Sequence, residues 1–101
     1  MALFRFLFDS KKSIQKIYDD GALLLDVRTQ AEWDAGHINN AIHIPLTELK
    51  KRIVELKQLE KPVIAYCKSG VRSARAVTHL KESGITAING GGCKSLSKII
   101  L

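Results

Sequence analysis

The chain has 101 residues, 46% of them hydrophobic, which is enough for one compact core but not for two, so we expect a single domain over residues 1–101. Sixteen basic residues against ten acidic ones give a net charge of +6, which allows attraction to anions of many kinds. The basic residues are spread along the chain and only 6% of residues are aromatic, a pattern that argues against the basic, aromatic-lined surface typical of nucleic-acid binding.

The first eight residues, M-A-L-F-R-F-L-F, are apolar except for Arg5. This run is too short to span a membrane, and no small-residue cleavage site follows it before Asp9. We therefore predict an edge strand or an arm that packs on the core, and no stable membrane insertion. The alternative is a remnant of an export sequence or a weak membrane contact.

Helical and extended patterns alternate along the first half of the chain. A first helix is predicted because Ser10 is a good N-cap and Gly21 a good helix end. The continuous apolar run that follows is typical of a strand covered on both faces. The predicted elements are a helix between Ser10 and Gly21, a strand over 22–27, a short helical turn between Thr29 and Gly36, and a strand over 41–44.

The second half continues the alternation. Its first element is an amphipathic helix of about three turns, with basic residues on the wet face. The predicted elements are this helix over 47–59, a strand over 62–66, a helix over 73–83, a strand over 85–88, and a C-terminal helix after the triple glycine at 90–92. Strands alternating with helices imply right-handed crossovers between parallel strands. We predict an α/β domain with a central, mainly parallel five-stranded sheet flanked by helices on both faces.

Cys67 stands where the strand over 62–66 ends and a helix is about to begin, and binding sites in such sheets gather at the carboxyl ends of strands. A loop that turns around one side chain can aim backbone N–H groups at it, and the following helix adds its positive dipole end. Lys68 and Arg72 add charge, and Gly70 permits a tight turn. We therefore predict a reactive cysteine with a lowered pKa, against the alternative of an inert buried one.

The remaining metal-binding residue types show no ligand spacing. Cys67 and Cys93 form no C-x-x-C pair, and His37, His43 and His79 lack the spacing of a zinc motif. Neither a disulfide framework nor a metal site is predicted.

Three segments resemble the rhodanese family of sulfurtransferases. The run L-L-L-D-V-R-T-Q-A-E-W-D-A-G-H-I-N-N-A-I-H-I-P resembles its first signature, C-K-S-G-V-R-S-A-R-A its active loop, and G-I-T-A-I-N-G-G-G its closing strand and turn. The similarity runs from Leu23 to Gly92 in the expected order. It implies a rhodanese-like fold in which Cys67 takes a sulfane sulfur from a small anionic donor such as thiosulfate. The resulting persulfide passes it to cyanide or another thiophilic acceptor, with no cofactor or metal.

The resemblance also assigns roles to particular residues. Lys68 and Arg72 would draw in the anionic donor. Apart from the resemblance, Asp26 and Arg28 stand at the carboxyl end of another strand, where they could orient the site, bind substrate or form a structural ion pair, the interpretation we favour. Trp33, His37 and Ile38 match the first signature, but they are expected to be packing and turn residues with no catalytic role. The backbone amides expected to form the anion cradle are those of Lys68, Ser69, Gly70, Val71, Arg72 and Ser73.

Cys93 departs from the family, which more often continues here toward an aromatic-containing helix. We expect an idle thiol rather than a resolving cysteine that attacks the Cys67 persulfide.

Other functions remain as alternatives. A related phosphatase would need a longer loop, because phosphate requires a wider ring of N–H groups than sulfur does, and only four residues separate Cys67 from Arg72. A noncatalytic rhodanese-like module that serves in binding or regulation often lacks its cysteine, so the presence of Cys67 argues against this function. A sulfur carrier with a protein acceptor stays open. We expect a cytoplasmic location, with a periplasmic one after removal of an export signal as the alternative.

Overall fold

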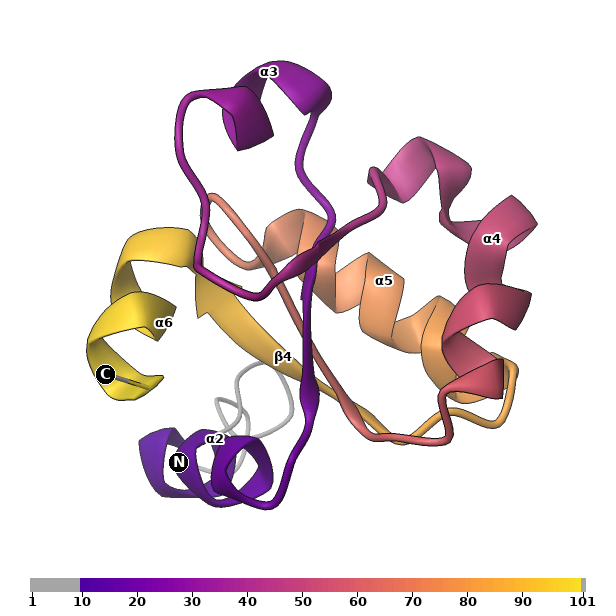
Figure 1. Ribbon diagram of the computed structural model, residues 1–101, viewed down its shortest axis with the longest axis horizontal. Helices are drawn as coiled ribbons and strands as arrows, with labels where there is room; N and C mark the ends of the chain where they lie inside the picture. Colours follow the sequence, from indigo (N-terminus) through magenta and orange to yellow (C-terminus); the bar gives the residue numbers. More distant parts are fainter. Residues whose placement is uncertain (1–9, 101) are drawn as a thin grey trace.

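A computed structural model describes residues 10–100 of the chain (Figure 1). Its strands are β1 (Leu23–Asp26), β2 (Ile42–His43), β3 (Val63–Cys67) and β4 (Ala87–Gly92). Its helices are α2 (Lys11–Asp19), α3 (Gln30–Asp34), α4 (Leu46–Gln58), α5 (Val71–Glu82) and α6 (Cys93–Ile100). No helix within these residues is long and apolar enough to cross a membrane.

The strands form one parallel sheet in the order β2-β1-β3-β4. In the central pair, Leu25 of β1 lies beside Ala65 of β3. The predicted parallel sheet is confirmed, but the prediction of five strands is wrong for the described part of the chain, which contributes four. Each extended apolar run between residues 10 and 100 already corresponds to one of the four strands. The N-terminal arm predicted as an edge strand lies outside the described residues.

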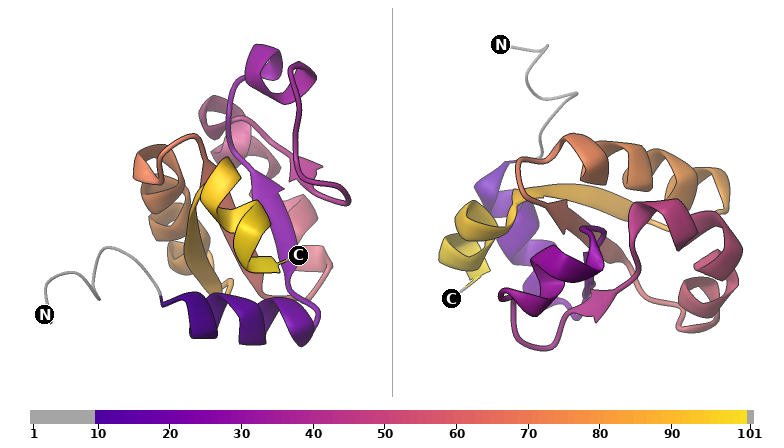
Figure 2. Two further views of the ribbon diagram at one scale, coloured as in Figure 1. Left: turned by 90° about the vertical axis from the view of Figure 1, so that its left-hand side faces the viewer. Right: turned by 90° about the horizontal axis from the view of Figure 1, so that it is seen from above.

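Helices cover both faces of the sheet, as Figure 2 shows from two further directions. Side chains on neighbouring strand positions point to opposite faces. Leu25 and Ala65 therefore pack toward α4 and α5, whereas Leu24 and Ile64 pack toward α2 and α6. Because both faces are buried, β3 can be apolar at every position, and all five of its residues are buried.

The helix starts follow local capping chemistry. The Ser10 side chain accepts the Ser13 N–H at 3.1 Å and begins α2, as predicted. Thr29 begins α3 with a complete capping box, in which the Glu32 carboxylate reaches back to the Thr29 N–H. Helix α5 begins at Val71, two residues earlier than predicted, because the loop turns sharply at Gly70, whose φ is 99°.

The end of β4 differs from the prediction, because the strand runs through the triple glycine to Gly92 instead of ending at residue 88. Close neighbours explain the glycines. A Cβ on Gly90 would lie 2.7 Å from Cγ2 of Ile64, and one on Gly92 would lie 2.5 Å from the carbonyl oxygen of Lys68. The strand thus passes directly beside the loop that follows Cys67.

Candidate active site

Cys67 is the last residue of β3, and the loop after it turns back around its sulfur before α5 begins. The Gly70 N–H donates to Sγ at 3.0 Å, and the Ser73 hydroxyl lies 3.4 Å from it. The backbone N–H groups of Ser69 and Ser73 also favour the ionised sulfur and lower its pKa. The side chain is fully buried, so these groups replace water around it.

The hydrogen bonds to Sγ decide how easily the thiol ionises. Burial raises the pKa of Cys67, but the Ser73 hydroxyl and the backbone N–H groups of Ser73, Ser69 and Gly70 outweigh it, so the pKa is lowered overall. The positive end of the α5 dipole acts in the same direction. A larger share of the sulfur is therefore thiolate at neutral pH than in a free cysteine.

The side chains of the loop point in different directions. Lys68, Ser69 and Val71 are exposed, whereas Ser73 is buried under the sulfur. The loop thus meets the sulfur with backbone N–H groups and one hydroxyl, and its lysine stands in solvent.

Asn89 of β4 links the loop to the sheet, and sequence reasoning missed it. Its Oδ1 accepts the Ser73 hydroxyl at 2.7 Å and the Gly91 N–H at 2.9 Å, and its Nδ2 donates to the Gly70 carbonyl at 2.9 Å. Because the group that Gly91 presents to the amide is an N–H and the group that Gly70 presents is a carbonyl, the amide can have only this orientation. The available signal was a single amide in an otherwise apolar strand beside the active loop.

Replacing Ser73 with alanine is expected to raise the pKa of Cys67, because the hydroxyl, whose single proton goes to Asn89 Oδ1 beside the neutral thiol, can turn that proton to Sγ when the thiolate forms. The midpoint of the pH dependence of iodoacetamide alkylation at Cys67 should move to higher pH. Ser69→Ala is the matched control, since it keeps the backbone N–H and removes only an exposed hydroxyl. An unchanged midpoint in Ser73→Ala would show that the backbone N–H groups suffice.

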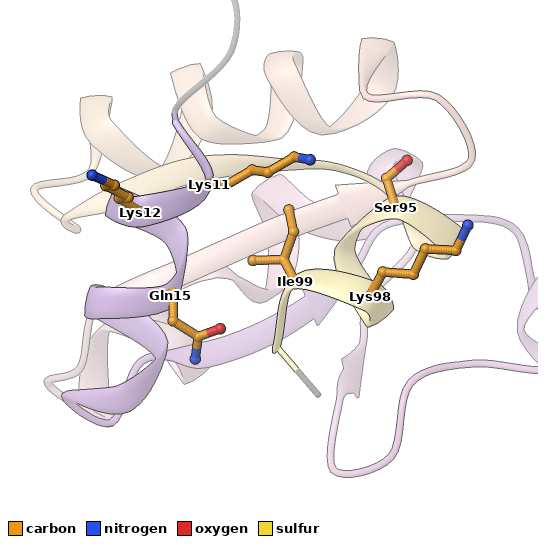
Figure 3. Close-up of a pocket in the computed structure, with 6 residues that line it drawn as sticks. All are labelled: Lys11, Lys12, Gln15, Ser95, Lys98 and Ile99. Carbon is orange, nitrogen blue, oxygen red and sulfur yellow. The ribbon is translucent and has the colours of Figure 1, made fainter.

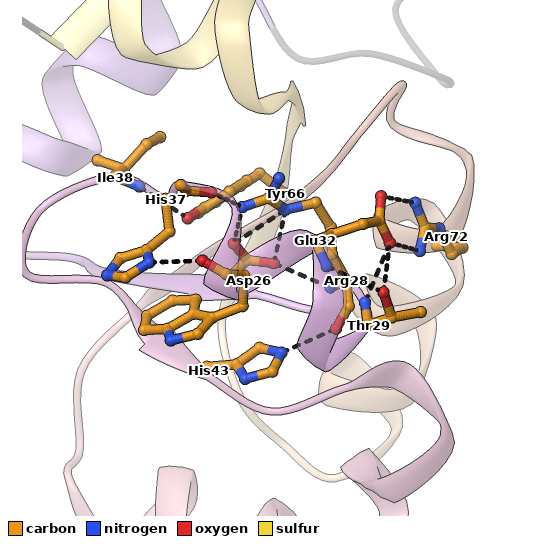
Figure 4. Close-up of polar contacts among 11 residues, drawn as sticks. Asp26, Arg28, Thr29, Glu32, His37, Ile38, His43, Tyr66 and Arg72 are labelled. Atoms are coloured by element: carbon orange, nitrogen blue, oxygen red, sulfur yellow. Dashed lines mark hydrogen bonds and ion pairs between the residues drawn. The ribbon is translucent and has the colours of Figure 1, made fainter.

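Arg72 forms a two-pronged ion pair with Glu32 of α3, drawn in Figure 4. Its Nη1 and Nη2 donate to Oε1 and Oε2 at 2.7 and 2.9 Å. The Arg72 hydrogen bonds are the main cause that lowers the pKa of Glu32 to about 2. Sequence reasoning expected Arg72 to draw in an anionic donor, whereas the structure directs its guanidinium to a carboxylate. The capping box that begins at Thr29 marked Glu32 in the sequence. No pattern in the neighbouring residues indicated that Glu32 would pair with Arg72.

Arg28 is paired in the same way with Asp26, and both are buried. Arg28 Nε donates to both carboxylate oxygens at 3.0 Å, and its Nη2 donates to Asp26 at 2.7 Å and to the Gly36 carbonyl at 2.8 Å (Figure 4). The bonds to Asp26 are the main reason that the pKa of Arg28 is raised. This geometry fits the structural interpretation, although Arg28 also lines a pocket described below.

Trp33 stacks with two histidines. The centroid of its ring system lies 3.4 Å from that of His37 and 4.7 Å from that of His43, with the rings nearly parallel. His43 Nε2 contacts the Arg28 carbonyl at 2.8 Å and His37 Nδ1 the Trp33 carbonyl at 3.0 Å. These contacts agree with the packing role expected for Trp33 and His37.

A pocket of about 500 Å³ lies beside the active loop. The loop forms one wall through Lys68, α3 another, and the start of α6 a third. Its lining residues are Arg28, Glu32, Ala35, Gly36, Lys68, Gly92, Cys93, Lys94 and Ser95. Its size falls in the range of small-molecule sites.

Cys93 lines this pocket, but its side chain packs with the cluster on the α2 and α6 face, whereas Cys67 belongs to the cluster on the α4 and α5 face. Both are free thiols, and burial raises the pKa of Cys93. Side chains on opposite faces of a sheet do not meet directly. The arrangement therefore favours an idle thiol over direct attack on a Cys67 persulfide.

Comparisons with known proteins identify the family of this chain. Residues 10–96 match the family model of the Rhodanese-like domain. A Bacillus subtilis relative, "Uncharacterized protein YqhL", is 46% identical over 67 residues, or 66% of this chain and 52% of that protein. The chain thus spans about half the length of this relative. An Allochromatium vinosum "Sulfurtransferase" is 35% identical over 75% of this chain and 71% of its own length.

A solved rhodanese structure has the same fold as this chain. "Rhodanese with anions from E. coli" superimposes with a TM-score of 0.69 and 34% identity, covering 74% of this chain and 91% of that one. The family model covers most of the chain, and the fold agrees with the solved structure. This chain therefore belongs to the rhodanese-like domain family.

Proposed function

We propose that the protein is a sulfurtransferase in which Cys67 carries sulfane sulfur as a persulfide. The observation that carries this proposal is the position of the Cys67 sulfur, held at a strand-to-helix loop by the Gly70 N–H and next to the Ser73 hydroxyl. The sulfurtransferase name of the A. vinosum relative supports it. The donor is thiosulfate or a similar compound, and the acceptor is cyanide or a thiol.

In the first half of the reaction, the Cys67 thiolate attacks the outer sulfur of thiosulfate. A bond forms between Sγ and that sulfur, the sulfur–sulfur bond of the donor breaks, and its electron pair leaves with sulfite. The negative charge of the persulfide then rests on the outer sulfur. In this proposal, backbone N–H groups of the loop stabilise that charge, as they favour the ionised form of Cys67 itself.

In the second half, cyanide attacks the outer sulfur and leaves as thiocyanate. The electron pair of the broken bond returns to Sγ, so Cys67 is a thiolate again. The Gly70 N–H, 3.0 Å from Sγ, stabilises this charge as it forms. The same contacts that lower the pKa of Cys67 thus make it a good leaving group.

Two alternatives are less well supported. A cysteine-dependent phosphatase would use the arginine of its loop to hold phosphate oxygens, but here Glu32 occupies the Arg72 guanidinium. A sulfur carrier would use the same Cys67 persulfide with proteins as donor and acceptor. A cytoplasmic location, which keeps both thiols reduced, belongs to the same proposal.

The proposal is tested by incubating the purified protein with thiosulfate and measuring its intact mass. We expect the mass of one added sulfur atom, its removal by a thiol, and thiocyanate release when cyanide is supplied. Cys93→Ser, the matched cysteine variant, should behave in the same way. Phosphate-ester hydrolysis without sulfur uptake would support the phosphatase instead.

A further inference from the structure

Of the two cationic side chains of the active loop, Arg72 is neutralised within the protein, whereas Lys68 is exposed. Arg72 is the guanidinium of the loop, and both of its terminal nitrogens donate to Glu32. A guanidinium clamps a dianion with this same pair of donors. With Glu32 in place, that edge of Arg72 is not open to a donor molecule.

Glu32 is held in this position by its own helix. Besides Arg72, its Oε1 accepts the N–H and the hydroxyl of Thr29, each at 3.1 Å. The pKa of Glu32 is lowered to about 2 by these partners, with Arg72 the main cause, so the carboxylate is ionised throughout the neutral range. Glu32 also lines the pocket beside the active loop. A donor entering this pocket therefore meets a fixed negative charge.

Arg72 does not line the pocket, and the cations that do line it offer no second clamp for a dianion. The Arg28 guanidinium already forms an ion pair with the Asp26 carboxylate. Lys68 and Lys94 are exposed, and solvent and salt screen exposed charges strongly. Together these groups suit a ligand with one negative charge better than one with two.

We propose that Glu32 is a specificity-determining residue that disfavours dianionic donors such as thiosulfate and favours sulfane donors with a single negative charge. This inference rests on the proposed function, because it concerns the first step of sulfur transfer to Cys67. The pocket is also far larger than thiosulfate requires, at about 500 Å³. Cys67 does not line this pocket, so the pocket would hold the organic group of a donor and not its outer sulfur.

The step is the same displacement with a different leaving group. The Cys67 thiolate attacks the outer sulfur of a thiosulfonate, R–SO₂–S⁻. The Sγ–S bond forms, the sulfur–sulfur bond of the donor breaks, and the electron pair leaves with the sulfinate, R–SO₂⁻. No oxidant, reductant or proton is needed, and Glu32 takes no part in the bond changes. Its effect is on the binding of the charged donor.

The test compares thiosulfate, with two charges, and benzenethiosulfonate, with one, in wild type and Glu32→Gln. Glutamine keeps the capping box of α3 and removes the charge. We expect kcat/KM for thiosulfate to rise by about fivefold or more, mainly through KM. This is the scale of repulsion between a single and a double charge several Å apart in watery surroundings. For benzenethiosulfonate the rise should be about twofold, because its charge is half as large.

Two controls separate the possible causes. Asp34→Asn removes a neighbouring exposed carboxylate of α3 and should leave both donors unchanged. Arg72→Ala combined with Glu32→Gln should lose most of the gain for thiosulfate if the gain comes from the freed guanidinium. An equal change for both donors, or none, in Glu32→Gln would overturn the inference. If the wild type takes up sulfur from neither thiosulfate nor benzenethiosulfonate, the proposed function would instead be overturned.

Discussion

Replacing Cys67 with serine is expected to abolish sulfur uptake and thiocyanate release completely. A serine hydroxyl is not ionised at neutral pH and cannot hold a sulfane sulfur, whatever the loop offers around it. The measurements are the intact mass after incubation with thiosulfate and the rate of thiocyanate formation. Serine keeps a small polar atom next to the Gly70 N–H and the Ser73 hydroxyl, so the folded structure should remain.

The control for this variant is its thermal unfolding, which should occur within a few degrees of the wild type. A folded but inactive variant assigns the chemistry to Sγ. Thiocyanate release at the wild-type rate by Cys67→Ser would place the sulfur on another group, and Cys93 would be the first to examine.

Replacing Asp26 with alanine is expected to have the largest effect on stability. The carboxylate is fully buried and takes hydrogen bonds from the backbone N–H and the guanidinium of Arg28. Without it, Arg28 keeps an unpaired charge in a residue that is only 8% exposed. Breaking one partner of a buried ion pair costs about 3–5 kcal/mol. The free energy of unfolding, measured with urea, should fall by about this amount.

Two further variants show whether the cost comes from the unpaired charge. Asp34→Ala removes an exposed carboxylate from the neighbouring α3 and should change stability by no more than about 0.5 kcal/mol. Arg28→Met combined with Asp26→Ala removes both charges and should recover part of the loss. A double variant less stable than Asp26→Ala alone would show that Arg28 contributes mainly through its bond to the Gly36 carbonyl.

Much of the fold could be predicted from the sequence because its signals lie within short segments. Ser10 and Thr29 begin helices with their own side chains, and the apolar run before Cys67 is long enough for a strand buried on both faces. The end of β4 was missed because glycine normally weakens a strand. Here the strand continues to Gly92, and this position requires glycine because the Lys68 carbonyl leaves no room for a side chain.

The residues around the sulfur were predicted less completely. The loop after Cys67 was recognised from its composition and its position between a strand and a helix. Asn89, which orients the Ser73 hydroxyl and holds the Gly70 carbonyl, lies on another strand and has no local pattern. Its proximity follows from the parallel pairing of β3 with β4, which places Cys67 beside Gly92.

Residues that are neighbours in the sequence are sufficient to predict an α/β domain with a reactive cysteine after a buried strand. Periodicity, capping and loop composition carry that information in neighbouring residues. Only the tertiary structure decided that Arg72 pairs with Glu32, 40 residues away, and that Cys93 packs on the face opposite Cys67. These outcomes depend on which distant segments meet across the sheet. The positive charge of Arg72, which the sequence suggests for substrate binding, is neutralised by Glu32, a residue that only folding brings near.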